Sequence, residues 1–149
     1  MKKTSFLTKD NIVLNLDAKS KTEAIKKLSH ILQKNGVVSD AEQFSKDVLA
    51  REKIDTTGMG KNIAIPHGKS KAVNSASLIF AKNKYPLDWQ SLDGSKVKII
   101  FLMAVRADDK GKEHLKMLAH ISGKLMDDKF VAQLKKENDP QKLLEIITK

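Results

Sequence analysis

The sequence predicts an α/β fold, and two observations support that prediction. Short apolar runs typical of strands alternate along the chain with longer segments whose apolar residues recur at helical spacing. A length of 149 residues, of which 40% are hydrophobic and 31% charged, is typical of one globular core. Because no repeat, low-complexity segment or linker interrupts the chain, we expect residues 1–149 to form a single domain.

Four short apolar segments are predicted strands. They span residues 12–16, 63–65, 78–81 and 97–105. The last segment is long and apolar enough to lie at the centre of a sheet. Ahead of it, Asp93 and Gly94 form a turn signal between two apolar segments, which we interpret as a hairpin connection and not as a site.

Capping signals predict the first two helices. Ser20 and Glu23 match a capping box, which opens a helix with a regular apolar stripe. Ser39 and Glu42 match a second box. The helix that this second box opens is expected to end near Arg51, which places that side chain at a helix end.

Two further helices are predicted toward the C-terminus. One covers about residues 112–126. The last begins with Asp139 as its N-cap and Pro140 in its first position, where proline is well tolerated. Strands that alternate with helices in this way favour an α/β architecture.

The composition excludes several classes of function. The chain has no cysteine, which excludes disulfides, thiolate zinc sites and cysteine nucleophiles. No apolar run approaches the ~18 residues of a membrane-spanning helix, so we expect no direct membrane insertion and take the cytoplasm as the compartment. The net charge of +10 is spread along the chain without a run of five like charges, which favours a lysine-rich solvated surface over a nucleic-acid site.

The four histidines are the best probe of function, because imidazole changes charge near neutral pH and is a ready nucleophile. His30 and His120 fall on the polar sides of their helices and are expected to face water. His114 lies on the apolar stripe of its helix, at the N-terminal end. Taken alone, His114 is better explained as a packed, hydrogen-bonded core histidine than as a reactive group.

His67 has the strongest local setting. It follows a strand-like segment at a point where the chain is expected to leave the sheet, after Pro66, which restricts the backbone. Gly68 carries no side chain that would crowd an incoming group. Upstream, residues 56–60 form a loop of small residues able to expose backbone N–H groups and hydroxyls to an anion, which suits phosphate. The local alternative is a turn with an incidental histidine.

Nucleotide-binding and metal-binding motifs fail on inspection. Residues 68–70 resemble the end of a P-loop, but Ile63 stands where that motif needs a glycine. The dinucleotide fingerprint that would begin at Gly58 fails at the same residue. We interpret the acidic pairs 108–109 and 127–128 as turn or helix-end residues and not as metal ligands. No cofactor and no metal are therefore expected.

Several motifs share one register along nearly the whole chain. They are Arg51-Glu52, Thr56-Thr57-Gly58-Met59-Gly60, Ile63-Ala64-Ile65-Pro66-His67-Gly68-Lys69 and His114-Leu115, together with Ser91-Leu92-Asp93-Gly94 and Leu125-Met126-Asp127-Asp128-Lys129-Phe130. In these motifs the sequence resembles the enzyme IIA family of the bacterial sugar phosphotransferase system, in the fructose/mannitol class that includes the nitrogen-regulatory IIA proteins. The resemblance implies a sandwich with a central mixed β-sheet flanked by helices.

The resemblance also implies a reaction. His67 would receive a phosphoryl group on Nε2 from the histidine-containing phosphocarrier protein and pass it to a cysteine of an enzyme IIB, which is associated with a membrane IIC. Nδ1 of His67 should then hold a hydrogen-bond partner that fixes the tautomer. Since the chain has no cysteine, we expect it to contain no such IIB domain and its acceptor to lie in another chain.

The family's second histidine and its arginine fall on His114 and Arg51. Phosphorylated His67 would carry a near-dianionic group, which suits the planar fork of an arginine and a ring N–H of a second histidine. The residues expected to bind or support the phosphate are Thr57, Gly58, Glu52 and Gly68. Met59 and Ile65 are expected to contact the partners.

The sequence departs from the family at Asn62, where the family often has a second glycine. Asparagine tolerates left-handed backbone, so the turn is expected to survive. Our interpretation is a phosphohistidine carrier in sugar uptake with no nucleic-acid partner. The alternative is a nitrogen-regulatory-type module, in which phosphorylation of His67 controls binding to regulatory targets, and a nucleic-acid-binding domain rests on charge alone.

Overall fold

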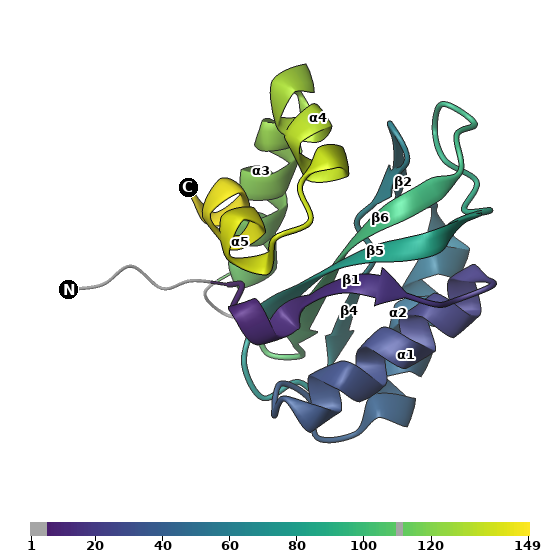
Figure 1. Cartoon of the computed structure of the whole chain (residues 1–149). Helices are drawn as coiled ribbons and strands as arrows, with labels where there is room; N and C mark the ends of the chain where they lie inside the picture. The colour runs from purple at the N-terminus through teal and green to yellow at the C-terminus, as the bar shows by residue number, and fades with distance from the viewer. Residues whose placement is uncertain (1–5, 110–111) are drawn as a thin grey trace.

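A six-stranded mixed sheet lies at the centre of the residues that the computed structural model describes, 6–109 and 112–149 (Figure 1). The strands are β1 Ile12–Leu16, β2 Gly58–Gly60, β3 Ile63–Ala64, β4 His67–Ser70, β5 Ser77–Leu87 and β6 Val97–Arg106. Their order is β1-β5-β6-β3-β2, and β4 also pairs with β6. The β5–β6 and β2–β3 pairs are antiparallel, whereas β1 is parallel to β5, and β3 and β4 are parallel to β6.

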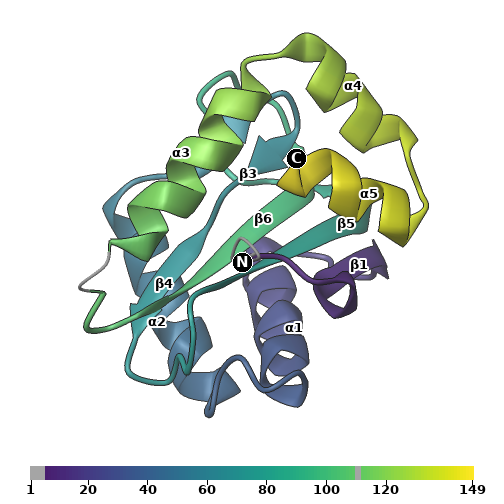
Figure 2. The ribbon, with the colours of Figure 1, turned by 90° about the vertical axis from the view of Figure 1, so that its left-hand side faces the viewer.

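Helices cover both faces of this sheet. The helices are η1 Lys9–Asn11, α1 Lys21–Lys34, α2 Ala41–Ile54, α3 Glu113–Leu125, α4 Asp128–Lys136 and α5 Pro140–Thr148. α1 and α2 lie on one face, and α3, α4 and α5 lie on the other (Figures 1 and 2). The α/β architecture with a central mixed sheet is therefore confirmed.

β6 contributes to two hydrophobic cores, one on each face of the sheet. Ile100 and Leu102 pack in the core beneath α1 and α2. Phe101 and Met103 pack in the core beneath α3, α4 and α5. Because both faces are covered, the strand is a nearly continuous apolar run, which confirms its predicted central place.

The predicted helix starts are mostly confirmed. The side chain of Ser20 accepts a hydrogen bond from the Glu23 amide at 3.1 Å, and Asp139 accepts one from the Lys142 amide at 3.0 Å. The second capping box is wrong, because Asp40, not Ser39, caps α2.

The reason is a tertiary contact on the residue before the cap. The Ser39 hydroxyl donates to the carbonyl of Ala72, at 3.2 Å, and is not available to the helix. Asp40 takes its place and accepts from the Gln43 amide at 3.1 Å.

Four elements were not predicted, namely η1, β2, β4 and α4. α4 is a helix of nine residues that begins after Asp127, whose side chain accepts from the Lys129 amide at 2.9 Å. β4 contains His67, so the expectation that the chain leaves the sheet at this residue is wrong. Instead the chain re-enters the sheet after Pro66, and His67 pairs with Met103 of β6.

The turn signal at Asp93 and Gly94 lies in the connection between the antiparallel strands β5 and β6, as predicted. Asp93 also joins this connection to the β2–β3 turn, because its carboxylate accepts from the Lys61 amide at 3.0 Å. Gly60 faces it with a φ of +98°, and a Cβ there would lie 2.9 Å from Oδ2 of Asp93. Asn62 has a φ of +70°, so the expected left-handed turn is confirmed.

Candidate functional site

A pocket of about 360 Å³ brings together the three residues singled out for chemistry. Its lining residues are Asp47, Ala50, Arg51, Ile54, His67, Lys69, Val105 and His114. They come from the last turns of α2, from β4 and β6, and from the first turn of α3. The pocket therefore lies where the two helical layers meet at one end of the sheet.

His67 is half-buried, and its ring orientation is fixed from the backbone. Nδ1 lies 3.3 Å from the carbonyl oxygen of Ile65. A carbonyl oxygen only accepts, so Nδ1 carries the hydrogen and Nε2 keeps a lone pair. The predicted partner for Nδ1 is thus confirmed.

The surroundings of His67 keep its ring neutral. Burial lowers the pKa of His67 below the ordinary 6.5, and electrostatic interactions with Arg51 and His114 lower it further, against the opposing effects of the Ile65 carbonyl and Glu52. Both the tautomer and the neutral charge leave Nε2 nucleophilic at pH 7.

Arg51 lies in the last turn of α2, as predicted. One guanidinium nitrogen, Nη1, donates to the carbonyl of Asp55 at 2.9 Å, which holds the side chain at the helix end. A guanidinium has five N–H donors in a planar fork, so this contact leaves the others for a ligand in the pocket.

Gly68 sets the distance between α2 and β4. A Cβ on Gly68 would lie 2.6 Å from Cγ2 of Val48 and 3.1 Å from Cε1 of Phe44, so only glycine allows this approach. Arg51 follows Val48 by about one helical turn and is carried toward His67 with it. The expectation that Gly68 leaves room for an incoming group is therefore wrong, because this residue faces α2.

His114 is half-buried in the first turn of α3, and its ring has a partner that the sequence analysis missed. Nδ1 of His114 pairs with a carboxylate oxygen of Asp109, whose side chain is 3% exposed. Asp109 also accepts from the Glu113 amide at 2.8 Å and from the His114 amide at 3.3 Å. Asp109 lies three residues before the N-cap Lys112, so no local capping signal indicates these contacts.

Glu52, Thr57 and Gly58 lie behind the pocket and do not line it. The Thr57 hydroxyl donates to the buried carboxylate of Glu52 and accepts from Nε1 of Trp89 at 3.1 Å. The Gly58 amide donates to the hydroxyl of Thr56 at 3.1 Å. The expectation that residues 56–60 expose their hydroxyls to an anion is therefore wrong at Thr57, which is 4% exposed.

Lys69 lines the pocket and was not singled out from the sequence. It is two residues after His67 in β4, so the two side chains lie on the same face of the strand. Among the many lysines of this chain nothing local distinguished it. Its ammonium is exposed and adds a cation at the pocket entrance.

The remaining two histidines lie outside the pocket. His30 is exposed, as predicted, with 61% of its side chain accessible. His120 was expected to face water, and this is wrong, because its Nε2 lies 2.7 Å from the carbonyl oxygen of Ile147. The ring thus contacts the end of α5, and the helix pattern alone could not show that contact.

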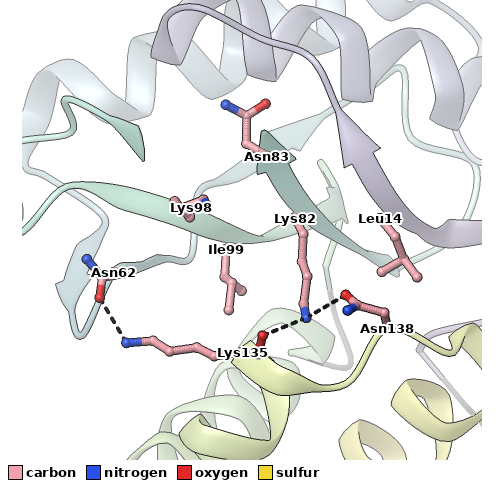
Figure 3. A pocket seen from close by; sticks show the side chains of 8 residues that line it. All are labelled: Leu14, Asn62, Lys82, Asn83, Lys98, Ile99, Lys135 and Asn138. Carbon is pink, nitrogen blue, oxygen red and sulfur yellow. Dashed lines mark hydrogen bonds between the residues drawn. The ribbon is translucent and has the colours of Figure 1, made fainter. Parts of the chain in front are cut away.

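A second pocket, of about 410 Å³, lies between the sheet and the segment joining α4 to α5 (Figure 3). The ammonium groups of two lysines that line it, Lys82 and Lys135, donate hydrogen bonds within the protein. Nζ of Lys82, whose pKa burial lowers, donates to the Lys135 carbonyl at 3.2 Å and to Oδ1 of Asn138 at 3.4 Å. Nζ of Lys135 donates to Oδ1 of Asn62 at 2.8 Å. These contacts fasten the end of α4 to the sheet, and no histidine lines the pocket.

Two further findings concern the residues that the structure covers, 6–109 and 112–149. No helix among them is both long and apolar enough to cross a membrane. No group of three or more histidine, aspartate or glutamate side chains among them could hold a metal ion.

Comparisons with known proteins agree with the interpretation of this pocket as a phosphoryl-transfer site. The family model described as phosphoenolpyruvate-dependent sugar phosphotransferase system, EIIA 2, matches residues 5–149. The chain is 33% identical over 145 residues to the "PTS system 2-O-alpha-mannosyl-D-glycerate-specific EIIABC component" of Escherichia coli, covering 97% of this chain and 22% of that protein. It is 31% identical over 137 residues to the "PTS system fructose-like EIIA component" of the same organism, covering 92% of each.

The chain thus spans about a fifth of the length of the multi-part relatives that it matches and nearly all of the single-component one. Among the solved structures that share its fold, two are similar over nearly the whole chain. The nitrogen regulatory protein IIA-Ntr from Neisseria meningitidis has a TM-score of 0.87 at 27% identity, over 96% of this chain and 97% of that one. A complex of enzyme IIAMTL and phosphorylated enzyme IIBMTL from Escherichia coli gives 0.78 at 25% identity, over 93% and 94%.

Proposed function

Because the chain belongs to the EIIA 2 family of the phosphoenolpyruvate-dependent sugar phosphotransferase system, we propose that it is a phosphohistidine carrier whose phosphorylated atom is Nε2 of His67. The observation that carries this proposal is the tautomer and the lowered pKa of the His67 imidazole. Its Nδ1 is held by the Ile65 carbonyl, its pKa is lowered by burial, and its Nε2 is left with a lone pair in a pocket. Arg51 and His114 line the same pocket and supply hydrogen-bond donors for a phosphoryl group.

The reaction needs no general base. The lone pair of Nε2 attacks the phosphorus of the phosphorylated histidine-containing phosphocarrier protein, a P–N bond forms, and the donor's P–N bond breaks with its electron pair left on the donor imidazole. In the second step a cysteine thiolate of an enzyme IIB attacks phosphorus, an S–P bond forms, and the electron pair of the broken P–N bond returns to Nε2 of His67. Such transfers pass through a loose, in-line transition state, so the protein mainly positions the groups and balances charge.

The charges around the pocket fit this role. A phosphoryl group on His67 carries close to two negative charges, and the guanidinium of Arg51 and the ammonium of Lys69 oppose them. Thr57, Gly58 and Glu52 support the site from behind, since they hold the loop after α2 through buried hydrogen bonds. Gly68 supports it by letting α2 pack closely on β4.

The rim of the pocket suits two partner proteins that bind in turn. Ile54 lines the pocket and is 79% exposed, and Leu115, next to His114, is 48% exposed. Met59 is 42% exposed and remains a candidate contact, whereas Ile65 is 2% exposed, so the expectation that it touches a partner is wrong. Apolar side chains exposed around a reactive group are typical of an interaction surface.

The likeness to an enzyme IIA that forms a complex with phosphorylated enzyme IIB supports a IIB acceptor for this chain, itself working with a membrane IIC. We take residues 1–149 to act as one enzyme IIA unit in the cytoplasm. The likeness to nitrogen regulatory IIA-Ntr favours a second candidate, a regulatory module whose phosphorylation state controls binding to its targets.

The first test is phosphorylation of His67. Incubation with the phosphocarrier protein and a phosphoryl donor is expected to label the wild-type chain and the His30→Ala control, in which an exposed histidine is removed. His67→Ala is expected to stay unlabelled. Persistent labelling of His67→Ala would remove this residue from the donor pathway.

The second test separates the two candidate functions. The phosphorylated chain is mixed with a panel of enzyme IIB domains, and loss of its label with gain of label on a IIB cysteine is measured. The carrier function predicts rapid discharge to at least one domain. A label retained against every fructose- and mannitol-type IIB would favour the regulatory module.

A further inference from the structure

Asp109 has a buried carboxylate next to the pocket, and the reaction described above assigns it nothing. Its side chain is 3% exposed, although a charged group is costly to bury unless it is paired. Three donors pair with it, namely the Glu113 amide, the His114 amide and Nδ1 of the His114 ring. Burial by itself would raise the pKa of Asp109, but these hydrogen bonds bring it below its ordinary value, so the carboxylate is ionised at pH 7.

The contact with Asp109 determines what the other side of the His114 ring can do. A carboxylate oxygen accepts, so Nδ1 of His114 carries a hydrogen and Nε2 is the nitrogen left to the pocket. In a neutral ring of this tautomer Nε2 has only a lone pair, which would face the oxygens of a phosphoryl group on His67. To donate to that group, Nε2 must take up a proton, and the ring then becomes an imidazolium.

We propose that Asp109 is a positioning residue for phosphoryl transfer, which fixes the tautomer of His114 and supplies the counter-charge of the imidazolium that donates from Nε2 to phosphorylated His67. This inference rests on the proposed function. It adds to the site a residue that acts on phosphorylated His67 only through His114. The proton comes from solvent when the phosphoryl group arrives and returns to solvent when the group leaves. No bond to Asp109 is made or broken.

The charges that face His114 favour this coupling. The pocket presents Asp47, Arg51, His67 and Lys69 to the ring. Beside it on α3, Glu113 and Lys116 form an ion pair with each other at 3.8 Å. Arg51 and Lys69 repel a positive charge on this ring, Asp47 and Asp109 attract it, and the negative charge of a phosphoryl group on His67 adds to that attraction. Proton uptake on phosphorylation follows from that change.

Two substitutions separate this role from helix capping. Asp109→Asn keeps an acceptor oxygen for the two backbone amides, since asparagine caps helices as well as aspartate does, but it removes the charge and can donate to Nδ1. Asp109→Glu keeps the charge but moves the carboxylate by one methylene from the amides. Asp108→Asn is the matched control, because Asp108 pairs with Arg106 at 3.0 Å on the exposed surface.

The readout is the ¹⁵N spectrum of the His114 ring, measured before and after phosphorylation, together with the lifetime of the phosphorylated form. In the wild type and in Asp108→Asn we expect a protonated Nδ1 before phosphorylation and both nitrogens protonated after it. In Asp109→Asn we expect a neutral ring whose hydrogen lies on Nε2 in both states, and a lifetime or transfer rate lower by roughly 10-fold, because a neutral donor binds the phosphoryl group more weakly than a charged one. Asp109→Glu should retain the imidazolium.

The proposal is overturned if Asp109→Asn keeps the wild-type ring protonation in both states, or if its transfer rate equals that of Asp108→Asn. A rate loss in Asp109→Asn with unchanged ring spectra would assign Asp109 to capping alone and also overturn it. A wild-type chain that takes no label on His67 would instead contradict the proposed function. In that case the unphosphorylated spectra still test the tautomer.

Discussion

At the scale of the residue, one backbone contact determines which ring nitrogen of His67 carries the hydrogen and which one can react. The Ile65 carbonyl takes the hydrogen of Nδ1, and the lone pair of Nε2 remains for phosphorus. Burial lowers the pKa of the same ring, so the lone pair is not lost to a proton near neutral pH. The hydrogen bond is local, whereas the burial and the charges that lower the pKa come from elements far away in the sequence.

The lowered pKa of His67 gives a direct prediction. An NMR titration of the ring is expected to have its midpoint below the 6.5 of a free imidazole, so the native state binds fewer protons than the unfolded state in the interval below 6.5. The contribution of His67 to stability is therefore unfavourable in that interval and disappears above it, which means stability rises with pH there. Arg51→Ala should move the midpoint upward, because a nearby positive charge is removed. A midpoint at or above 6.5 in the wild type would contradict this account of the ring.

Arg51 gives a second prediction, on geometry. Arg51→Ala is expected to fold but to lose about 10- to 100-fold in the rate of phosphoryl transfer or the lifetime of the phosphorylated form. Arg51→Lys keeps the charge without the planar fork and should recover only part of the loss. Lys53→Ala, on the exposed side of the same helix turn, is the control. Equal rates and lifetimes for Arg51→Ala and the control would refute the proposed role.

At the scale of the element, the contact between α2 and β4 positions the site. Gly68→Ala would place a Cβ 2.6 Å from Val48, so α2 or β4 must shift, and a loss of about 1–3 kcal/mol is expected from such overpacking. Transfer should fall as well, since Arg51 moves with the helix. Gly123→Ala in α3 is the matched control, because nothing lies within 4 Å of its Cβ, and it should stabilise the chain by up to about 1 kcal/mol. Urea unfolding and the labelling assay measure both variants, and an undiminished free energy of unfolding in Gly68→Ala would contradict the close packing.

The connection between β5 and β6, which carries Asp93, gives a prediction on pH. Hydrogen bonds from Ser95 and from the Lys61 amide lower the pKa of Asp93 from 3.8 to about 2. A lowered carboxyl pKa contributes stability that is present above 3.8 and is lost as pH falls through about 2. Asp93→Asn should therefore have a lower melting temperature than the wild type at pH 6, and the difference should shrink steadily below pH 4. A difference that is constant from pH 6 to pH 2 would show that the charge of Asp93 is not responsible.

The same elements show what the sequence could and could not predict. The caps at Ser20 and Asp139 are local, and they were predicted correctly. The cap of α2 was assigned to Ser39 and belongs to Asp40, because the Ser39 hydroxyl is taken by Ala72, a residue far away in the sequence. β4 was missed for a similar reason, since its residues have little strand propensity and are held by pairing with β6.

At the scale of the whole molecule, the pocket depends on both helical layers. Arg51 comes from α2 on one face of the sheet and His114 from α3 on the other, with His67 on β4 between them. The histidine motif was visible in the sequence because Pro66 and Gly68 stand beside it. The Asp109–His114 pair and Lys69 were not visible, because their importance depends on where packing places α3 and the edge of the sheet. Local contacts could thus be predicted, whereas the contacts of Asp109 and Lys69, which depend on packing between distant elements, could not.

The whole surface also has to admit two protein partners in turn, and Ile54 provides the last prediction. It lines the pocket and is 79% exposed, so Ile54→Ser should leave the free energy of unfolding within about 0.5 kcal/mol of the wild type. If the rim is the docking surface, the loss of an apolar contact should raise the KM for the phosphocarrier protein by about fivefold or more, with little change in kcat, because the reacting groups are untouched.

Met126→Ser removes an apolar side chain that is 83% exposed just beyond the opposite end of α3 and should change neither constant. A kcat that falls while KM stays constant would place Ile54 in the reaction itself, and an unchanged KM in Ile54→Ser would move the docking surface away from the pocket.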